Sequence, residues 1–313
     1  MHQTRVIFMG SPAFAVPALE QLLEHRELVQ VVGVVTQPDK PAGRGRVLTP
    51  PPVKVTATAH GLPVLQPAKM KAEATHQSLR ELAPDLMVVA AYGRILPPAM
   101  LAIPRLGCVN VHASLLPRHR GASPINHAIL AGDREVGVAI MRMEEGLDTG
   151  PVFVMRGMPT PAGATTESLS ATLATLGAEL LVEALPGIVA GTLAPTPQNH
   201  AAATYAPLLE KEHGKLDFTK AAEVLERQVR AFHPWPGSFA KKGPQRVQIL
   251  EVQVLPDVHG PAGQVVTADK HGVIVACGQG GLRLVTLQPE GKKAMPAAAW
   301  VAGRGVAVGD SLG

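Results

Sequence analysis

Aromatic residues and cysteines are scarce in this chain. Only 3% of its 313 residues are aromatic, which argues against recognition of nucleic acid by extensive base stacking. The two cysteines, Cys108 and Cys277, lie far apart and form no CxxC pair. Their placement argues against a disulfide framework and a thiolate zinc site, and it fits a reducing cytoplasm. The twelve histidines form no HExxH pattern, so we expect no bound metal.

Long apolar runs and nucleotide-binding motifs are also missing. No run of about 18 uncharged apolar residues occurs, and the N-terminus enters a strand pattern without an apolar signal segment. We therefore expect neither a membrane span nor a secretory leader. The first apolar run continues into "GSPAF" rather than GxGxxG, and no Walker A pattern follows anywhere. The sequence thus disfavours an NAD-binding or ATP-binding domain.

The first two-thirds of the chain alternates apolar runs with helix-like segments. Runs such as "LVQVVGVVT" and "DLMVVAAYG" alternate with segments such as "PAFAVPALEQLLEH", whose apolar residues recur at helical spacing. This alternation predicts βαβ units and a mostly parallel sheet that helices cover on both faces. The runs "EVGVAIMRM" and "GPVFVMRGM" predict two further strands, and a long helix pattern after them could close the domain.

The composition changes after that helix pattern. Proline, alanine and threonine dominate residues 190–205, which lack periodicity and predict a linker over the surface. An amphipathic helix and several short valine-rich strands follow, and they predict a small β-barrel. We therefore expect an α/β domain at 1–189, a linker at 190–207 and a barrel domain at 208–313.

The charge pattern permits a polyanionic partner without establishing one. The formal net charge is +4, and basic residues form small local clusters, for example Arg118 with Arg120. Each such cluster, taken alone, is ordinarily a solvated face. Barrels of the OB type often hold nucleic acid, but the fold by itself does not assign that use.

Two polar residues interrupt the strand pattern "GCVNVHA" at 107–113. Side chains alternate across a strand, so Asn110 and His112 point to the same face. They lie near the carboxyl end of the strand, where open α/β sheets bind ligands. A single buried histidine is ordinarily a hydrogen-bonded core residue, whereas two polar residues on one face favour a functional site.

A candidate partner for this pair lies in the segment "EEGLDTGPV". Its Asp148 sits between glycines, where aspartate is ordinarily only a turn residue. Placed near His112, this carboxylate would favour the charged imidazolium. An imidazolium and the Asn110 amide both donate hydrogen bonds, which suits the oxyanion formed when a carbonyl is attacked. Cys108 lacks an identified base and is expected in the core, so these residues favour direct acyl transfer to an external nucleophile.

At these residues the sequence resembles the folate-dependent formyltransferases. The resemblance is carried by "NVHASLLPRHRGASPI" and "GVAIMRMEEGLDTGPV" with their spacing, and by "TQPDKPAGRGRVLTPPPVKV", "FHPWPGSF" and "GKKAMPAAAW" elsewhere in the chain. It implies a Rossmann-like catalytic domain followed by an OB-like tRNA-binding barrel. It also implies 10-formyltetrahydrofolate as formyl donor and initiator methionyl-tRNA as acceptor. A cytoplasmic monomer is expected on the same grounds.

The resemblance also implies roles for individual residues. The catalytic residues would be Asn110, His112 and Asp148; the folate-binding residues would be Ser114, Leu115, Leu116 and Pro117; and the tRNA-binding residues would be Lys40, Arg44 and Arg46. The two leucines would offer apolar surface to a pterin. The tRNA-binding residues lie in the segment Asp39–Arg46, which we call the cationic loop. Its composition is otherwise typical of a flexible surface loop, although its charges suit phosphate contacts. His119 departs from the family pattern, which often has an aromatic residue at this position.

Three alternatives stay open on sequence grounds. The same site could formylate a small amine, such as glycinamide ribonucleotide or an amino sugar nucleotide. It could release formate by hydrolysis, or it could be a relict pocket in a non-catalytic tRNA-binding module. The barrel and the cationic loop argue against glycinamide ribonucleotide, and the complete set of Asn110, His112 and Asp148 argues against a relict.

Overall fold

The chain divides into two compact units in the computed structural model, which describes residues 3–42, 45 and 47–313. The first unit consists of Met1–Pro124, Glu135–Pro159 and Ser170–Ala206. The second consists of Ile125–Arg134, Thr160–Leu169 and Pro207–Gly313.

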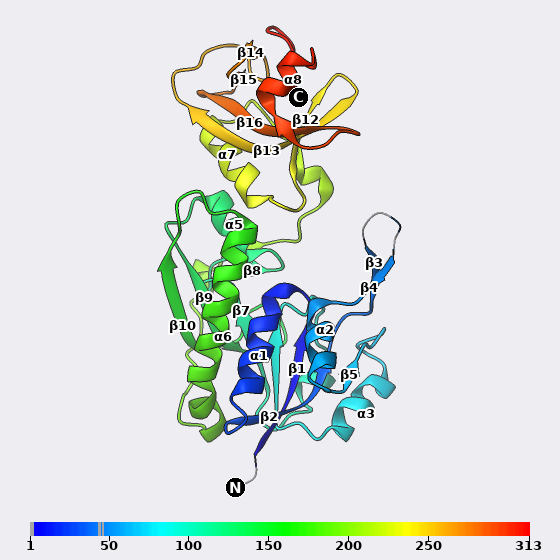
Figure 1. Cartoon of the computed structure of the whole chain (residues 1–313). Helices are drawn as coiled ribbons and strands as arrows, with labels where there is room; N and C mark the ends of the chain where they lie inside the picture. Colours follow the sequence, from blue (N-terminus) through cyan, green and yellow to red (C-terminus); the bar gives the residue numbers. More distant parts are fainter. Residues whose placement is uncertain (1–2, 43–44, 46) are drawn as a thin grey trace. The chain divides into compact units, whose positions relative to one another are not determined.

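A seven-stranded sheet forms the centre of the first unit (Figure 1). Its strands lie in the order β10 (Val152–Pro159), β9 (Glu135–Arg142), β7 (Cys108–His112), β6 (Leu86–Ala90), β1 (Thr4–Gly10), β2 (Val29–Val35) and β5 (Val64–Leu65). The five strands from β7 to β5 are parallel, whereas β9 and β10 are added antiparallel at one edge. This sheet confirms the predicted Rossmann-like α/β class, with the last two predicted strands as an antiparallel addition.

Helices pack on both faces of this sheet. They are η1 (Ala13–Ala15), α1 (Val16–Glu24), α2 (Pro52–Ala59), α3 (Glu73–Glu81), α4 (Pro98–Leu101) and the greater part of α6 (Thr166–Ala190). The unit also contains the short helix η2 (His200–Ala202), which has no buried residue. On one face, Leu79 of α3 and Met100 of α4 share a core cluster with Cys108. On the other face α6 comes close to β7, because a Cβ added at Gly177 would lie 2.7 Å from Val111. Strand alternation thus gives β7 one face against α6 and the opposite face toward α3 and α4.

Helix α6 is apolar enough in composition and long enough to cross a membrane. Its 18-residue window has a mean hydropathy of 1.6, yet half of that window is buried within the structure. Burial of this extent is typical of a core helix, the role predicted for the segment that could close the domain.

Two short strand pairs complete the first unit. Strands β3 (Lys40–Ala42) and β4 (Val47–Thr49) form an antiparallel hairpin, and β8 (Arg120–Gly121) pairs in parallel with β11 (Tyr205–Ala206). Periodicity in the sequence predicts neither pair, because strands of two or three residues hold too few side chains to show it. Strand β11 lies within 190–207, and the limits proposed for the two domains and the linker stay predictions.

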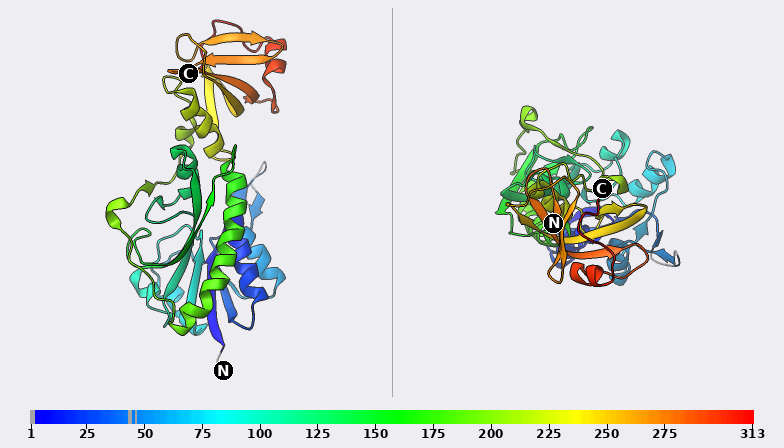
Figure 2. Two further views of the ribbon diagram at one scale, coloured as in Figure 1. Left: turned by 90° about the vertical axis from the view of Figure 1, so that its left-hand side faces the viewer. Right: turned by 90° about the horizontal axis from the view of Figure 1, so that it is seen from above.

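An antiparallel sheet forms the centre of the second unit (Figures 1 and 2). Its strands lie in the order β12 (Ser238–Lys242), β13 (Gln245–Leu255), β16 (Gly281–Pro289), β15 (Gly272–Ala276) and β14 (Val265–Asp269), with β17 (Met295–Pro296) paired to β16. The remaining helices are α5 (Pro124–Ala131), η3 (Lys211–Gly214), α7 (Ala222–Ala231) and α8 (Ala297–Ala302). Leu225 of α7, Val247 of β13 and Trp300 of α8 share its core. The sheet agrees with the predicted small β-barrel.

Candidate active site

Strand β7 carries its polar residues to the carboxyl edge of the parallel strands. Cys108, at the beginning of the strand, is in the core, as expected, and burial raises the pKa of its thiol to about 12. Asn110 is half-buried, and its amide makes no hydrogen bond with any of the described residues. His112 ends the strand and is buried. The same face therefore changes from apolar core to polar site within five residues.

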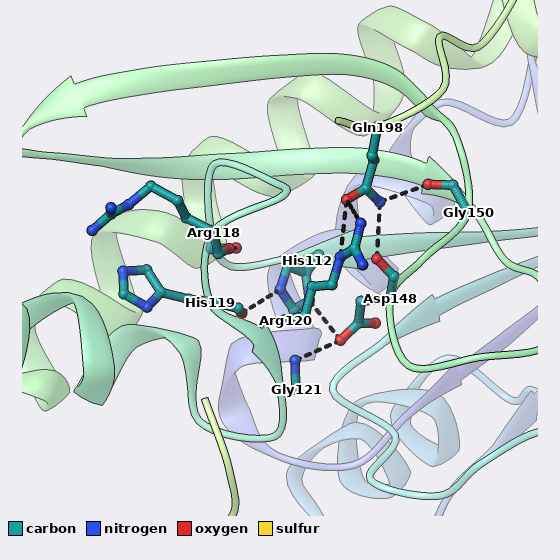
Figure 3. Close-up of polar contacts among 9 residues, drawn as sticks. His112, Arg118, His119, Arg120, Gly121, Asp148, Gly150 and Gln198 are labelled. Carbon is teal, nitrogen blue, oxygen red and sulfur yellow. Dashed lines mark hydrogen bonds and ion pairs between the residues drawn. The ribbon is translucent and has the colours of Figure 1, made fainter. Parts of the chain in front are cut away.

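The imidazole of His112 lies between two oxygen atoms (Figure 3). Its Nε2 lies 3.1 Å from the backbone oxygen of His119, and its Nδ1 lies 3.7 Å from Oδ2 of Asp148. The same Oδ2 accepts a 2.8 Å hydrogen bond from the backbone N–H of Gly121. A neutral imidazole has one N–H and a doubly protonated ring has two, so only the charged ring could donate to both oxygens.

Asp148 occupies a turn with a positive backbone angle, φ 52°. This left-handed conformation is disfavoured for most residues, although aspartate tolerates it better than branched or bulky ones. The turn places the carboxylate within the site, where its side chain is 16% exposed. The structure therefore brings Asp148 to His112, on the strand face that also carries Asn110. The catalytic roles of these three residues stay predictions.

A second layer of buried polar side chains supports this turn (Figure 3). The Nε2 of Gln198 donates to the backbone oxygens of Asp148 and Gly150, at 2.8 and 2.7 Å. The Oε1 of Gln198 accepts from Nε and Nη2 of Arg120, at 3.1 and 2.7 Å. Nη2 of Arg120 also lies 3.1 Å from Nδ1 of His200.

Sequence reasoning did not identify Gln198 or the position of Arg120. Gln198 lies in the proline-, alanine- and threonine-rich segment and is 9% exposed, whereas Arg120 is 2% exposed. The interpretation of Arg118 and Arg120 as a solvated pair is wrong for Arg120, because its guanidinium donates into the protein interior. Nothing in the local pattern distinguishes a buried arginine here from its exposed neighbour Arg118.

The residues expected to bind folate differ in how much surface they offer. Ser114 is buried, and its hydroxyl donates to the backbone oxygen of Arg118 at 2.6 Å. Leu116 is 4% exposed and packs in a small core cluster. Its side chain therefore does not offer the apolar surface that we expected of both leucines. Leu115 and Pro117 are half-buried and have side-chain surface available to a ligand.

Of the residues expected to bind tRNA, the structure describes Lys40, which begins strand β3. Lys40 is exposed and donates to Oε1 of Gln37 at 2.7 Å. Arg44 and Arg46 lie outside the described residues. At the base of the hairpin, Lys54 forms a 2.8 Å ion pair with Asp39, and these contacts hold the pKa of the Asp39 carboxyl below its usual value.

Metal ligands do not cluster in the part of the chain that the structure describes. Within 3–42, 45 and 47–313, no three His, Cys, Asp or Glu side chains are arranged to hold an ion. The site around His112 instead contains hydrogen-bond donors and one carboxylate. A half-buried amide, an imidazole between two oxygens and a carboxylate held by a backbone N–H suit stabilisation of an oxyanion and transfer of a proton.

Comparison with known proteins matches both parts of the chain to one family. The profile described as "Formyl transferase" matches residues 4–185, and "Formyl transferase, C-terminal domain" matches residues 208–305. Methionyl-tRNA formyltransferase of Myxococcus xanthus is 50% identical over 309 residues, which cover 99% of this chain and 98% of that protein.

Solved structures share the fold at low sequence identity. The sugar 3N-formyltransferase WlaRD, in the presence of dTDP and 5-N-formyl-THF, has a TM-score of 0.67 at 16% identity and covers 94% of this chain and 100% of that one. HypX from Aquifex aeolicus, in complex with tetrahydrofolic acid, has a TM-score of 0.65 at 19% identity and covers 96% of this chain and 47% of that one. At these identities the likeness shows the fold alone.

Proposed function

Because the chain belongs to the formyl transferase family, we propose that it formylates the α-amino group of methionine on initiator methionyl-tRNA. The formyl donor in this proposal is 10-formyltetrahydrofolate. Relatives that carry the name methionyl-tRNA formyltransferase match nearly the whole chain, and structural neighbours contain tetrahydrofolic acid or 5-N-formyl-THF. The observation that carries the proposal is the 3.7 Å approach of Asp148 to His112, on the strand face that also presents the Asn110 amide.

The proposed reaction is direct transfer without a covalent enzyme intermediate. The uncharged amine attacks the formyl carbon and forms a new C–N bond. The carbonyl oxygen then carries the negative charge of a tetrahedral intermediate. Collapse of that intermediate breaks the bond from the formyl carbon to N10 of the folate. The amine loses one proton and N10 gains one, so the products are formylmethionyl-tRNA and tetrahydrofolate.

Asn110, His112 and Asp148 have different roles in the proposed reaction. The Asn110 amide is free to donate to the oxyanion, since it has no partner among the described residues. The Nε2–H of His112 would be a second donor, its hydrogen shared between the oxyanion and the His119 oxygen that lies 3.1 Å away. Asp148 orients the imidazole and assists removal of the amine proton, directly or through one water. Removal of one such donor typically costs about 10²–10³-fold in kcat.

Recognition of the acceptor is proposed to rest on cations and shape. Lys40, Arg44 and Arg46 would contact phosphates, and the C-terminal barrel would bind the tRNA as well. We place the reaction in the cytoplasm, where tRNA is aminoacylated and used, and we expect the enzyme to act as a monomer.

The deciding experiment uses 10-formyltetrahydrofolate labelled in its formyl group. Incubation with methionyl-tRNA should yield labelled formylmethionyl-tRNA, and omission of the tRNA should stop consumption of the donor. Formate release without acceptor would identify a hydrolase. Label transfer to glycinamide ribonucleotide or an amino sugar nucleotide in preference to the tRNA would identify a small-amine transferase. Binding of tRNA with no turnover would leave only a binding module.

A further inference from the structure

We propose that Gln198 and Arg120 are positioning residues that fix the turn carrying Asp148 against His112. This inference rests on the proposed function, because it concerns the carboxylate that assists transfer. It assigns a role to two residues that do not contact the reacting atoms.

Gln198 holds the turn at two backbone positions, Asp148 and Gly150, and we call this pair of contacts the clamp. Its amide nitrogen reaches the backbone oxygens of Asp148 and Gly150, so it spans both ends of the turn. Both N–H groups of one amide are thereby used, and both partners are backbone atoms that cannot rotate away. The turn is therefore held from inside the protein, on its backbone, while the Asp148 side chain stays available to His112.

Arg120 fixes the orientation of that amide. Two of its nitrogens donate to Oε1 of Gln198, which forces the amide nitrogen to face the turn. A flipped amide would place N–H against N–H and oxygen against oxygen. Because Arg120 is 2% exposed, water cannot substitute for these contacts, and each unmet group would cost about 1–3 kcal/mol.

Arg120 also ties the clamp to the loop that follows β7. It pairs with Tyr205 in the β8–β11 ladder, and the next residue, Gly121, donates its N–H to Oδ2 of Asp148. One two-residue strand therefore orients the amide of Gln198 with its side chain and holds the Asp148 carboxylate with its backbone. This arrangement explains how Asp148 keeps a left-handed conformation in a turn that is open on its outer side, where Leu147 is 51% exposed.

The test is Gln198→Glu, which keeps the size of the side chain and the acceptor for Arg120 but removes the amide donors. We expect kcat for formyl transfer to fall about 10²-fold, the scale of a misplacement of about 1 Å. KM for donor and tRNA should change less than about threefold, because Gln198 makes no contact with either substrate in this proposal and their binding in the ground state is unchanged. The neighbouring Asn199→Ala is the matched control, since Asn199 is exposed and, among the described residues, its side chain accepts only from Ala201. It should behave as the wild type.

A double-mutant cycle separates positioning from general damage. In an Asp148→Ala background, Gln198→Glu should lower single-turnover transfer by less than about twofold, because no carboxylate remains to be misplaced. An equal loss in both backgrounds, or a kcat in Gln198→Glu within about threefold of the wild type, would overturn the inference. If Gln198→Glu does not fold, Arg120→Lys carries the same test, and full kcat in that variant likewise overturns it.

The wild-type reaction separates this inference from the proposed function. Absence of formyl transfer by the wild-type protein refutes the proposed function before any variant is made. If the wild type transfers the formyl group and the Gln198→Glu and Arg120→Lys variants keep full kcat, the positioning role of Gln198 and Arg120 is refuted and the proposed function stands.

Discussion

Two loops that follow parallel strands of the same sheet are built in opposite ways. The loop after β7 folds back into the protein: His119 and Arg120 are buried, and the backbone of Gly121 holds the carboxylate of Asp148. The loop after β2 projects as the β3–β4 hairpin, where Lys40 is exposed and Val47 and Leu48 are 67% and 66% exposed. One loop contributes backbone atoms to a buried network, and the other presents side chains to solvent.

The difference follows from the tasks proposed for the two loops. Stabilisation of an oxyanion needs donors that are already in place, because reorganisation during the reaction lowers the benefit. Contacts with a phosphate backbone need charge within reach and tolerate motion. We therefore expect substitutions after β7 to act on kcat and substitutions at the hairpin to act on KM for tRNA.

The largest effect is expected at the donor that the structure leaves free. Asn110→Ala should lower kcat for formyl transfer at least about 10²-fold, because the oxyanion loses a preorganised N–H. Asn110→Asp is the sharper variant, since it keeps the shape and replaces the donor with a negative charge. Near-normal turnover of either variant under saturating donor and tRNA would remove Asn110 from the catalytic set.

A smaller effect is expected where the loop backbone holds Asp148. A Cβ at Gly121 would lie 2.6 Å from the backbone oxygen of Ala206, at a φ of 122° that suits glycine. Gly121→Ala should lower kcat about 10-fold by moving the N–H that holds the carboxylate. Its free energy of unfolding should fall by about 1–3 kcal/mol.

The matched control for this change is Gly191→Ala. Gly191 also has a positive φ, 69°, but a Cβ there meets nothing within 4 Å. It should lose stability without losing kcat. Equal activity losses in the two variants would show that Gly121 matters only through folding.

The sequence predicts the sheet but only part of this site, for physical reasons. Hydrophobic alternation identifies β7 and places Asn110 and His112 on one face, because the strand period is 2. The distance from His112 to Asp148 depends on a turn 36 residues away in sequence, which no local pattern measures. The role of Gln198 could not be predicted for the same reason. Its partners, Arg120 and the backbone oxygens of Asp148 and Gly150, are distant in sequence, and the residues around it show no periodicity.

A milder effect is expected at the base of the hairpin. Lys54→Met should raise KM for methionyl-tRNA several-fold and leave kcat unchanged, because Lys54 pairs with Asp39 and joins it to Gln66. Lys71→Met removes the same charge from an exposed residue outside this network and serves as control. The comparison of loops is contradicted if Lys54→Met lowers kcat while KM for tRNA stays constant.

The smallest effect is expected one step back along β7. Cys108 shares a face with Asn110 but lies in the core, and burial raises the pKa of its thiol to about 12. At pH 8 the thiolate is therefore rare, so iodoacetamide should leave Cys108 unmodified in the native protein and alkylate it in urea, as mass spectrometry can show. Because the folded state disfavours the thiolate, this group lowers stability as pH rises from its ordinary value of 9.0 toward 12. Cys108→Ala should keep full kcat; loss of turnover would mean that the catalytic part of β7 begins before Asn110.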